Sequence, residues 1–162
     1  MPSTASPHRI LFVCLGNICR SPAAEIIFRH VVKAEGREED FKIDSAGTID
    51  YHQGNPPDAR MSATLKDKGY TIAGQSRIIL TSDLDDFDLI VTMDECNLEE
   101  VQAMVSSDEQ KTKIRPFVSF LQNMDAPRIP DPYHGGQKGF EEVIELLEDG
   151  CEGILKELPS SE

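Results

Sequence analysis

Short apolar runs of strand length alternate with segments of helical periodicity along this chain, and this alternation restricts the fold more than any other feature. The run RILFVCL, residues 9–15, is continuous and rich in branched side chains, which is typical of a strand buried on both faces. FKIDSAG (41–47) and FDLIVTM (87–93) indicate two more strands, and TKIRPFVSF (112–120) is a candidate fourth. Because strands that alternate with helices form parallel sheets covered on both faces, the sequence predicts an α/β fold.

Caps and apolar stripes indicate the helices between these runs. Ser21 is a good N-cap, and Pro22 suits the first position of the helix that follows. Residues 56–69 and 94–105 also have helical patterns, the second with acids in its first turn. The longest pattern, residues 139–158, predicts an amphipathic helix. Its apolar stripe consists of Phe140, Val143, Ile144, Leu147, Cys151, Ile154 and Leu158.

The composition is that of an ordinary globular chain of 162 residues with an acidic balance. We expect a single domain over residues 1–162, with flexible polar tails at about 1–7 and 159–162, and a monomer. The net charge of −13 argues against binding to nucleic acid and against attachment to an anionic membrane. The apolar run near the N-terminus is too short to span a bilayer, and no cleavage signal follows it. The sequence therefore predicts a soluble, cytoplasmic protein.

The cysteines and histidines do not have the spacing of metal ligands. No cysteine pair has the C-x-x-C spacing of zinc ribbons, and the four histidines include no H-x-x-x-H pair. We expect no metal site and no cofactor. The even number of cysteines is compatible with two disulfides, but a cytosolic chain of this size does not need them. The cysteines are Cys14, Cys19, Cys96 and Cys151.

The segment VCLGNICRSPAAE, residues 13–25, comes at the end of the first predicted strand, where parallel sheets bind ligands. Gly16 and Asn17 readily adopt left-handed backbone angles, so the chain can turn sharply there and point its N–H groups inward as an anion cradle. The following helix adds the positive end of its dipole, and Arg20 can grip two phosphate oxygens. Cys14 lies at the mouth of this cradle, where the same donors would stabilise a nucleophilic thiolate.

From the residues alone, two interpretations of this segment remain open. A cysteine and an arginine six positions apart also arise by chance, and many cysteines are small buried hydrophobes in structural loops. The placement at a strand end, with a Gly-Asn turn, an arginine and a Ser-Pro helix start, favours nucleophilic catalysis on a phosphate ester.

The same segment strongly resembles the phosphate-binding loop of low-molecular-weight protein tyrosine phosphatases. The similarity covers nearly the whole chain and includes DSAGT after the second predicted strand, VTMDECNL after the third and DPYH near the end. The resemblance implies a three-layer sandwich, in which a four-stranded parallel sheet has helices on both faces and the phosphate-binding loop follows the first strand. It also implies hydrolysis of phosphotyrosine in tyrosine-phosphorylated proteins, and of small aryl phosphates, through a cysteinyl-phosphate intermediate.

The resemblance assigns roles to single residues. Cys14 matches the nucleophile and Arg20 the arginine that grips the phosphate. Ser21 matches the hydroxyl beside the sulfur, Asn17 the residue that fixes the loop, and Ser45 a serine of the supporting hydrogen-bond network. The other loop residues expected around the phosphate are Leu15, Gly16, Ile18 and Cys19.

The segment RIPDPYHGG carries the expected general acid. From the residues alone, Asp131 between two prolines is usually a turn residue, whereas the resemblance makes it the acid and base of the reaction. Tyr51 and Tyr133 resemble the aromatic walls that hold a substrate ring, although an exposed tyrosine is also ordinary. The family often has a second tyrosine where this chain has His134.

Other functions are associated with similar loops. Related arginine-phosphate phosphatases carry threonine at the position of Ile18, and an apolar isoleucine favours an aryl substrate. Arsenate reduction resembles a relay of three thiols, but Cys96 has no partner cysteine after the third predicted strand. An anion-binding module without catalysis is disfavoured by the presence of Cys14, Arg20 and Asp131.

Two further expectations concern the surroundings of the loop. Oxidised Cys14 could form a reversible disulfide with Cys19, as often happens in this family, or Cys19 could be only a packed loop residue. The family also often has a histidine near AGQSR, residues 73–77, where this chain has Gly74 and Gln75. We therefore expect the network that supports the loop to be built differently here.

Overall fold

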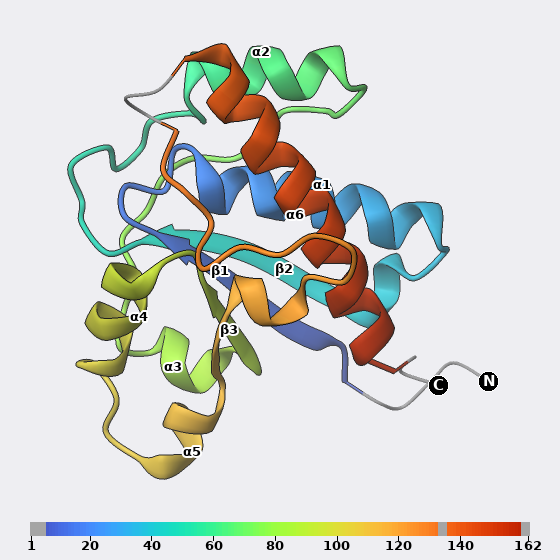
Figure 1. Cartoon of the computed structure of the whole chain (residues 1–162). Coiled ribbons are helices and arrows are strands. Elements are labelled where there is room, and N and C mark those ends of the chain that lie inside the picture. The colour runs from blue at the N-terminus through green and yellow to red at the C-terminus, as the bar shows by residue number, and fades with distance from the viewer. Residues whose placement is uncertain (1–5, 133–135, 160–162) are drawn as a thin grey trace.

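The computed structural model describes residues 6–132 and 136–159. At its centre is a sheet of four parallel strands in the order β2-β1-β3-β4. Figure 1 shows helices on both sides of this sheet, so the molecule has three layers. The predicted α/β class and the four-stranded parallel sheet are confirmed. The strands are β1 His8–Cys14, β2 Phe41–Gly47, β3 Leu89–Thr92 and β4 Ile114–Pro116.

The two helical layers differ in size. The long helices α1 and α6 pack against each other over one face of the sheet, with α2 beside α6, whereas the shorter α3, α4 and α5 lie on the other side (Figure 1). The helices are α1 Arg20–Ala34, α2 Ala59–Asp67, α3 Asp83–Asp86, α4 Glu95–Gln102, α5 Asp108–Thr112 and α6 Gln137–Glu157, with 3-10 turns η1 Glu38–Asp40 and η2 Phe117–Phe120.

The strand β1 lies between β2 and β3, which explains its continuous apolar sequence. Ile10, Phe12 and Cys14 belong to the core under α1 and α6, and Leu11 and Val13 belong to the core on the opposite face. Successive side chains of a strand point to opposite faces, so a central strand covered on both sides needs an apolar residue at every position. The same burial holds the end of β1 in place, and the candidate loop begins there.

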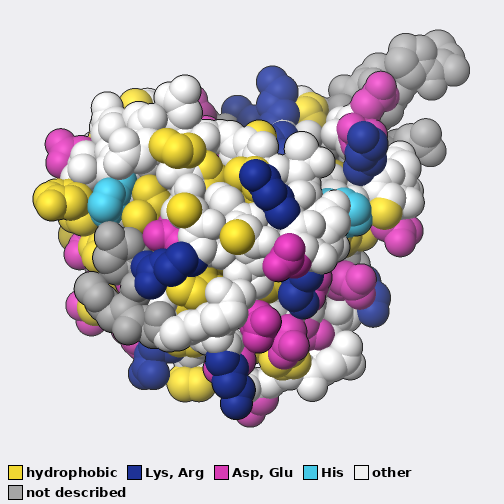
Figure 2. Space-filling view, turned by 90° about the horizontal axis from the view of Figure 1, so that it is seen from above, with side chains coloured by type: hydrophobic (Ala, Val, Ile, Leu, Met, Phe, Trp, Pro, Cys, Tyr) yellow, Lys and Arg dark blue, Asp and Glu magenta, His cyan; other side chains and the backbone are white. Residues whose placement is uncertain are grey.

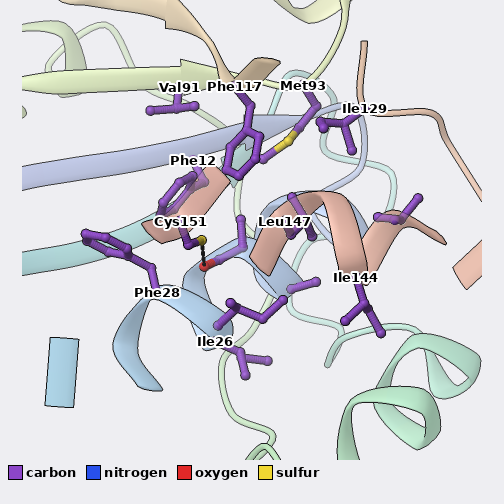
Figure 3. Packing of buried hydrophobic residues seen from close by; sticks show 14 of the residues in the cluster. Phe12, Ile26, Phe28, Val91, Met93, Phe117, Ile129, Ile144, Leu147 and Cys151 are labelled. Atoms are coloured by element: carbon purple, nitrogen blue, oxygen red, sulfur yellow. Dashed lines mark hydrogen bonds between the residues drawn. The ribbon is translucent and has the colours of Figure 1, made fainter. Parts of the chain in front are cut away.

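The larger core is built around aromatic rings (Figure 3). The ring of Phe12 meets that of Phe28 edge-to-face, with centroids 6.0 Å apart, and lies 6.3 Å from the ring of Phe117. The buried thiol of Cys151 on α6 donates a hydrogen bond to the carbonyl of Ala24, 3.7 Å away. The predicted stripe on α6 faces this core, and only its last member is partly exposed.

The boundaries of two helices differ from the prediction. Ser21 is not an N-cap, because α1 already begins at Arg20 and the residue in the N-cap position is Cys19. The hydroxyl of Ser21 bonds to groups of the candidate site instead. The helix α2 begins later than predicted, after Asp58, whose carboxylate accepts hydrogen bonds from two amides of the first turn.

The fourth strand is shorter than predicted. It ends at Pro116, which has no N–H group to continue the ladder, and the chain then turns into η2. Phe117 and Phe120 of this turn pack closely against α6. A Cβ atom added at Gly150 would lie 2.1 Å from Phe117 Cε1, and one at Gly153 would lie 1.9 Å from the carbonyl oxygen of Phe120. Two glycines of α6 therefore permit this contact.

Most of the expected polar tails lie outside the described residues. Where the chain is described, Nε2 of His8 lies 2.8 Å from the carbonyl oxygen of Pro159, so the first strand and the end of the chain are in contact. Within the described ranges, the helices are too short or too polar to cross a membrane.

Candidate active site

Cys14 is the last residue of β1, and residues 15–19 form a loop that leads into α1. Asn17 has a φ of 56°, which is the left-handed region expected for this turn. Gly47 at the end of β2 lies against the loop, and a Cβ atom there would be 2.8 Å from the carbonyl oxygen of Leu15. Only glycine allows this approach. Gly47 is thus a site residue to which the sequence analysis gave no role, although it is part of DSAGT.

The carbonyl groups of the loop accept hydrogen bonds from surrounding segments. In a planar trans peptide the C=O and N–H groups point in opposite directions. Because these carbonyls are held on the outside, the N–H groups of the same peptides face the concave side of the loop, as an anion cradle requires. The bonds are Thr48 N–H to the oxygens of Cys14 (3.0 Å) and Leu15 (2.9 Å), Ser76 Oγ to that of Gly16 (2.8 Å) and Asp58 N–H to that of Ile18 (2.7 Å).

A small pocket opens above this loop. It brings together the predicted nucleophile, the predicted arginine and the predicted general acid, which are far apart in the sequence. It also contains two residues that the sequence analysis did not select, Ile49 and His52. The complete lining is Cys14, Leu15, Gly16, Ile18, Cys19, Arg20, Ile49, His52 and Asp131.

Behind the pocket, a chain of hydrogen bonds leads away from the sulfur. Sγ of Cys14 lies 2.9 Å from Oγ of Ser21, which accepts a hydrogen bond of 2.8 Å from Nδ2 of Asn17. The hydroxyl hydrogen of Ser21 is therefore available to the sulfur, with the carbonyl of Ala46 at 3.4 Å as the other acceptor. Oδ1 of Asn17 accepts a hydrogen bond of 3.0 Å from the main-chain N–H of Arg77.

The guanidinium of Arg20 is buried and held from one side. Its Nη1 donates to Oδ2 of Asp94 (2.7 Å) and to the carbonyl of Ile129 (2.9 Å), and its Nη2 lies 3.7 Å from Oδ2 of Asp131. Burial disfavours the charged form, but the sulfur of Cys14 and the carboxylate of Asp94 outweigh it and raise the pKa of Arg20 above its ordinary value. The cation is thus secured next to the sulfur.

Asp94 is a second residue that the sequence analysis did not assign to the site. It is the N-cap of α4 and forms a capping box with Asn97. The main-chain N–H of Asn97 donates to the carboxylate of Asp94 at 2.9 Å. Burial tends to raise the pKa of Asp94, but the bonds from the Asn97 amide and from Arg20 lower it overall. The available signal was the position of an aspartate after the third strand, within VTMDECNL.

Asp131 lies at the edge of the pocket, and 42% of its side chain is exposed. An exposed carboxyl group at this place can reach both water and the leaving group of a bound ester. The segment that follows it carries Tyr133 and His134, which lie outside the described residues.

Tyr51 is highly exposed, with 81% of its surface accessible, and its ring packs edge-on against the ring of His52 at 4.9 Å. His52 lines the pocket and lies over the loop, since a Cβ atom at Gly16 would be 2.9 Å from its Cδ2. In this part of the described chain, the pocket wall is formed by Ile49 and His52. The role of Tyr51 as a wall stays a prediction.

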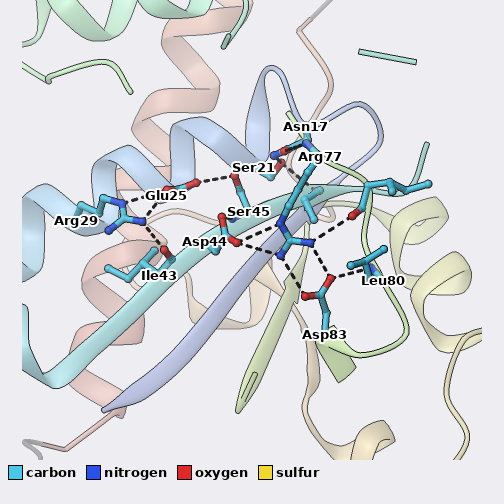
Figure 4. Close-up of polar contacts among 12 residues, drawn as sticks. Asn17, Ser21, Glu25, Arg29, Ile43, Asp44, Ser45, Arg77, Leu80 and Asp83 are labelled. Atoms are coloured by element: carbon cyan, nitrogen blue, oxygen red, sulfur yellow. Dashed lines mark hydrogen bonds and ion pairs between the residues drawn. The ribbon is translucent and has the colours of Figure 1, made fainter. Parts of the chain in front are cut away.

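Ser45 is buried and supports α1. Its hydroxyl donates to Oε1 of Glu25 at 2.6 Å, and Glu25 in turn binds Arg29. Arg29 also donates to the carbonyl of Ile43 on β2 (Figure 4). Ser45 thus ties the helix that follows the loop to the neighbouring strand.

Near residues 73–77, where the network that supports the loop was expected to differ, the structure has Ser76 and Arg77 in contact with it. Ser76 binds the carbonyl of Gly16, and the side chain of Arg77 bridges Asp44 and Asp83 (Figure 4). Asp83 is the first residue of α3, and its carboxylate also accepts a hydrogen bond of 2.7 Å from the main-chain N–H of Leu80. Its side chain is 8% exposed, since α3 buries it against Arg77.

Potential metal ligands are dispersed over the described residues, where no group of three or more histidine, cysteine or acidic side chains is suited to hold a metal ion. All four cysteines are free, and Cys96 is the exposed one.

Comparisons with known proteins agree with this architecture. The family model for low molecular weight phosphotyrosine protein phosphatase matches residues 9–162. The low molecular weight protein-tyrosine-phosphatase YfkJ of Bacillus subtilis is 41% identical over 90% of this chain and 92% of the relative. A crystal structure of a protein tyrosine phosphatase from Entamoeba histolytica is 42% identical, with a TM-score of 0.90, and covers 93% of this chain and 96% of its own. That of a drosophila arginine phosphatase is 34% identical, with a TM-score of 0.86, over 94% and 99%. The chain therefore belongs to the low molecular weight phosphotyrosine protein phosphatases, a family of hydrolases.

Proposed function

We propose that this enzyme hydrolyses phosphotyrosine in proteins, and small aryl phosphates, through a cysteinyl-phosphate intermediate. The observation that carries the proposal is the convergence of Cys14, Arg20 and Asp131 on one pocket, above a loop whose carbonyls are held outward. Inward N–H groups and a fixed guanidinium are donors that suit the oxygens of a phosphate ester. No metal and no organic cofactor takes part in this mechanism.

In the first step, the thiolate of Cys14 attacks phosphorus. The bond between phosphorus and the tyrosine oxygen breaks, and Asp131 donates its proton to that oxygen. Arg20, fixed by Asp94, holds two of the remaining oxygens as their negative charge is redistributed. The products of this step are free tyrosine side chain and phosphocysteine.

In the second step, water hydrolyses the phosphocysteine. Asp131 accepts a proton from the attacking water, the sulfur–phosphorus bond breaks, and inorganic phosphate leaves. The hydroxyl of Ser21, 2.9 Å from Sγ of Cys14, can donate to the departing sulfur and stabilise its charge. The enzyme returns to its starting state.

Phosphotyrosine is the substrate that the pocket walls favour. Ile18 is almost fully buried at the pocket, and Leu15 and Ile49 are partly exposed at its rim. These apolar side chains suit the faces of an aryl ring. The similarity to an arginine phosphatase keeps phosphoarginine as the alternative substrate. Arsenate reduction is less favoured, because Cys96 on α4 is the one cysteine after β3 until Cys151, which is buried in the core.

The decisive experiment is hydrolysis of 4-nitrophenyl phosphate and of a phosphotyrosine peptide by the wild type, Cys14→Ser and Asp131→Ala. We expect near-complete loss with Cys14→Ser, and a fall in kcat of about 10²–10⁴-fold with Asp131→Ala, the usual contribution of a general acid. Equal rates in all three proteins would defeat the mechanism. Faster hydrolysis of a phosphoarginine peptide than of the phosphotyrosine peptide would favour phosphoarginine as the substrate. Arsenate reduction in a thioredoxin-coupled assay would favour an arsenate reductase instead.

Redox regulation is a finer part of this proposal. Burial, and then the charges of Asp58, Cys14 and Asp131, raise the pKa of Cys19. Because peroxide attacks thiolates, the raised pKa protects Cys19 from direct oxidation. Peroxide would oxidise Cys14 to a sulfenic acid. The thiol of Cys19 would then condense with this sulfenic acid to form a disulfide and water. We expect thiols to restore activity after peroxide in the wild type but not in Cys19→Ser. Irreversible loss in the wild type would contradict this regulation.

The expected partners are tyrosine-phosphorylated proteins. On the face shown in Figure 2, basic side chains are interspersed with acidic ones. Several expectations stay predictions. They are the absence of binding to nucleic acid and membranes, a cytoplasmic location, a single domain and a monomeric state.

A further inference from the structure

We propose that Ser76 and Arg77 are positioning residues: together they form a brace that keeps the phosphate-binding loop in its anion-binding conformation. The proposal rests on the function proposed above, because it concerns the same pocket. Neither side chain is part of the pocket lining. We call these two residues the 76–77 brace.

Ser76 fixes the direction of one loop peptide. Its side chain is buried, and its hydroxyl donates to the carbonyl of Gly16 at 2.8 Å. This bond holds the carbonyl outward, and the N–H of Asn17 in the same planar peptide then points toward the pocket. Ser76 itself is fixed by main-chain bonds, from its own N–H to the carbonyl of Asn55 (2.7 Å) and from the amide of Gly54 to its carbonyl (2.8 Å).

Arg77 fixes the side chain of Asn17 and the end of β2 through its main chain. Its N–H donates to Oδ1 of Asn17 at 3.0 Å, which orients Nδ2 of Asn17 toward Ser21 and thereby toward the sulfur of Cys14. Its carbonyl accepts a hydrogen bond of 2.8 Å from the amide of Gly47, the glycine that lies against the loop. One residue therefore connects the loop with the neighbouring strand.

The side chain of Arg77 anchors this arrangement. Its guanidinium donates to Asp44 (3.0 and 3.2 Å) and to both carboxylate oxygens of Asp83 (2.9 and 3.2 Å), so β2 and α3 hold it from two sides (Figure 4). Two carboxylates thus face a single positive charge. The guanidinium is therefore committed to these partners, and its influence on the bound anion passes through the main chain.

The signal in the sequence is the segment AGQSR, in which Gly74 and Gln75 stand where the family often has a histidine. A buried serine hydroxyl is a neutral donor, unlike an imidazole, which changes its charge near neutral pH. Support by Ser76 is thus independent of pH over the range in which an imidazole titrates. A loss of phosphate affinity that exceeds the loss of stability is the readout that a purely structural role would not produce.

The test compares the brace variants Ser76→Ala, Arg77→Ala and Arg77→Lys with two matched controls. Ser119→Ala removes another serine hydroxyl that donates to a carbonyl at 2.8 Å, and Arg37→Ala removes another arginine that binds a carboxylate and two carbonyls. Both controls lie away from the pocket. The measurements are kcat and KM for 4-nitrophenyl phosphate, the dissociation constant of inorganic phosphate by calorimetry, and the free energy of unfolding in urea.

We expect Ser76→Ala to weaken phosphate binding and to lower kcat by about 3- to 10-fold each, the loss of one neutral hydrogen bond. Arg77→Ala should do so more strongly, and Arg77→Lys should recover part of the loss.

The control variants should lower the free energy of unfolding while leaving kcat and phosphate affinity at wild-type values. Brace variants with wild-type kcat and wild-type phosphate affinity would overturn the proposal that Ser76 and Arg77 position the loop. A wild type that binds phosphate without hydrolysing any ester would overturn the proposed function, and the calorimetric comparison would still decide on the brace. Absence of phosphate binding by the wild type would overturn both.

Discussion

Nη1 of Arg20 lies 2.7 Å from Oδ2 of Asp94. The N-cap residue of α4 therefore fixes the guanidinium that lines the pocket above the loop after β1. The two residues are 74 positions apart in the sequence. They meet because β1 and β3 are neighbours in a parallel sheet, whose strands end at the same edge. The capping box with Asn97 in turn fixes the carboxylate, and the arginine is oriented before a phosphate arrives.

Asp94→Ala tests this relationship. Removal of the carboxylate leaves a buried cation without its main partner, so we expect kcat/KM for aryl phosphates to fall by about 10- to 100-fold, the scale of one hydrogen bond between charged groups. Steady-state kinetics would measure it. The control is Glu95→Ala, which removes the neighbouring carboxylate and its exposed pair with Arg128, and should leave kcat/KM unchanged. Similar values for both variants would contradict the role of Asp94.

Gly47→Ala should damage the site through sterics alone. The new Cβ would lie 2.8 Å from the carbonyl oxygen of Leu15 and 3.0 Å from the carbonyl carbon of Gly16, so the loop must move. We expect a fall in phosphate affinity of about 10-fold or more, since displaced amides no longer converge on the anion. Calorimetry with inorganic phosphate would measure it. At Gly136 a Cβ meets nothing within 4 Å, and Gly136→Ala should bind phosphate normally.

Two glycines of α6 should respond in opposite ways to alanine. In Gly153→Ala the Cβ would lie 1.9 Å from the carbonyl oxygen of Phe120, and we expect the free energy of unfolding to fall by about 3 kcal/mol or more through overpacking against backbone. In Gly139→Ala the nearest atom is Cβ of Pro132 at 3.8 Å, and helix propensity predicts a gain of up to about 1 kcal/mol. Urea unfolding would measure both. A stable Gly153→Ala would show that α6 does not pack on η2 as described.

The buried thiol of Cys151 predicts a loss of stability in alkali. Burial, and then the charges of Glu148 and Glu152, raise the pKa of this thiol well above its ordinary value. Above pH ~8.5 the unfolded chain loses this proton while the folded chain retains it, so stability present at lower pH is lost as pH rises. At pH ~9.5 the loss from this thiol is about 1.4 kcal/mol.

Urea unfolding of the reduced protein near neutral pH and at pH ~9.5 would measure this loss. In Cys151→Ala the alkaline decrease should be smaller by about 1.4 kcal/mol. Cys96→Ala is the control, because Cys96 is exposed in the fold, and its decrease should match that of the wild type. An unchanged decrease in Cys151→Ala would show that the folded chain ionises this thiol as readily as the unfolded one.

Ile18→Thr should change substrate preference. Ile18 is 9% exposed and lines the pocket, so a hydroxyl in its place would weaken contacts with an aryl ring and add a polar partner for a guanidine. We expect the ratio of kcat/KM for phosphotyrosine peptide over phosphoarginine peptide to fall by about 10-fold, the scale of a lost apolar contact. Ile18→Val keeps an apolar side chain and should keep the ratio. A ratio unaffected by Ile18→Thr would place the selectivity elsewhere in the pocket.

Local patterns in the sequence indicated the strands of the sheet and a candidate anion-binding loop after the first of them. The central strand was recognisable because both of its faces are buried, and residues 41–47 matched the observed β2 to the residue. The strand end, the Gly-Asn turn and the arginine are contiguous, so residues 13–25 contain most of the candidate site. Interactions close in sequence determine these features, which is why a single sequence predicts them.

Tertiary structure decided which distant residues support the loop. Asp94, Ser76 and Gly47 act through contacts between segments 30 to 75 residues apart. Their local sequence indicates a helix cap, a loop serine and a strand-end glycine, but it does not show which groups of the loop they contact. Ser21 shows the same limit, because it was predicted to cap the helix, whereas its hydroxyl contacts the sulfur of Cys14. The sequence by itself determined the strand, turn and helix that form most of the candidate site. Only the parallel pairing of β1 with β2 and β3 decided which carbonyls, carboxylates and amides surround them, because hydrogen bonds depend on positions in space.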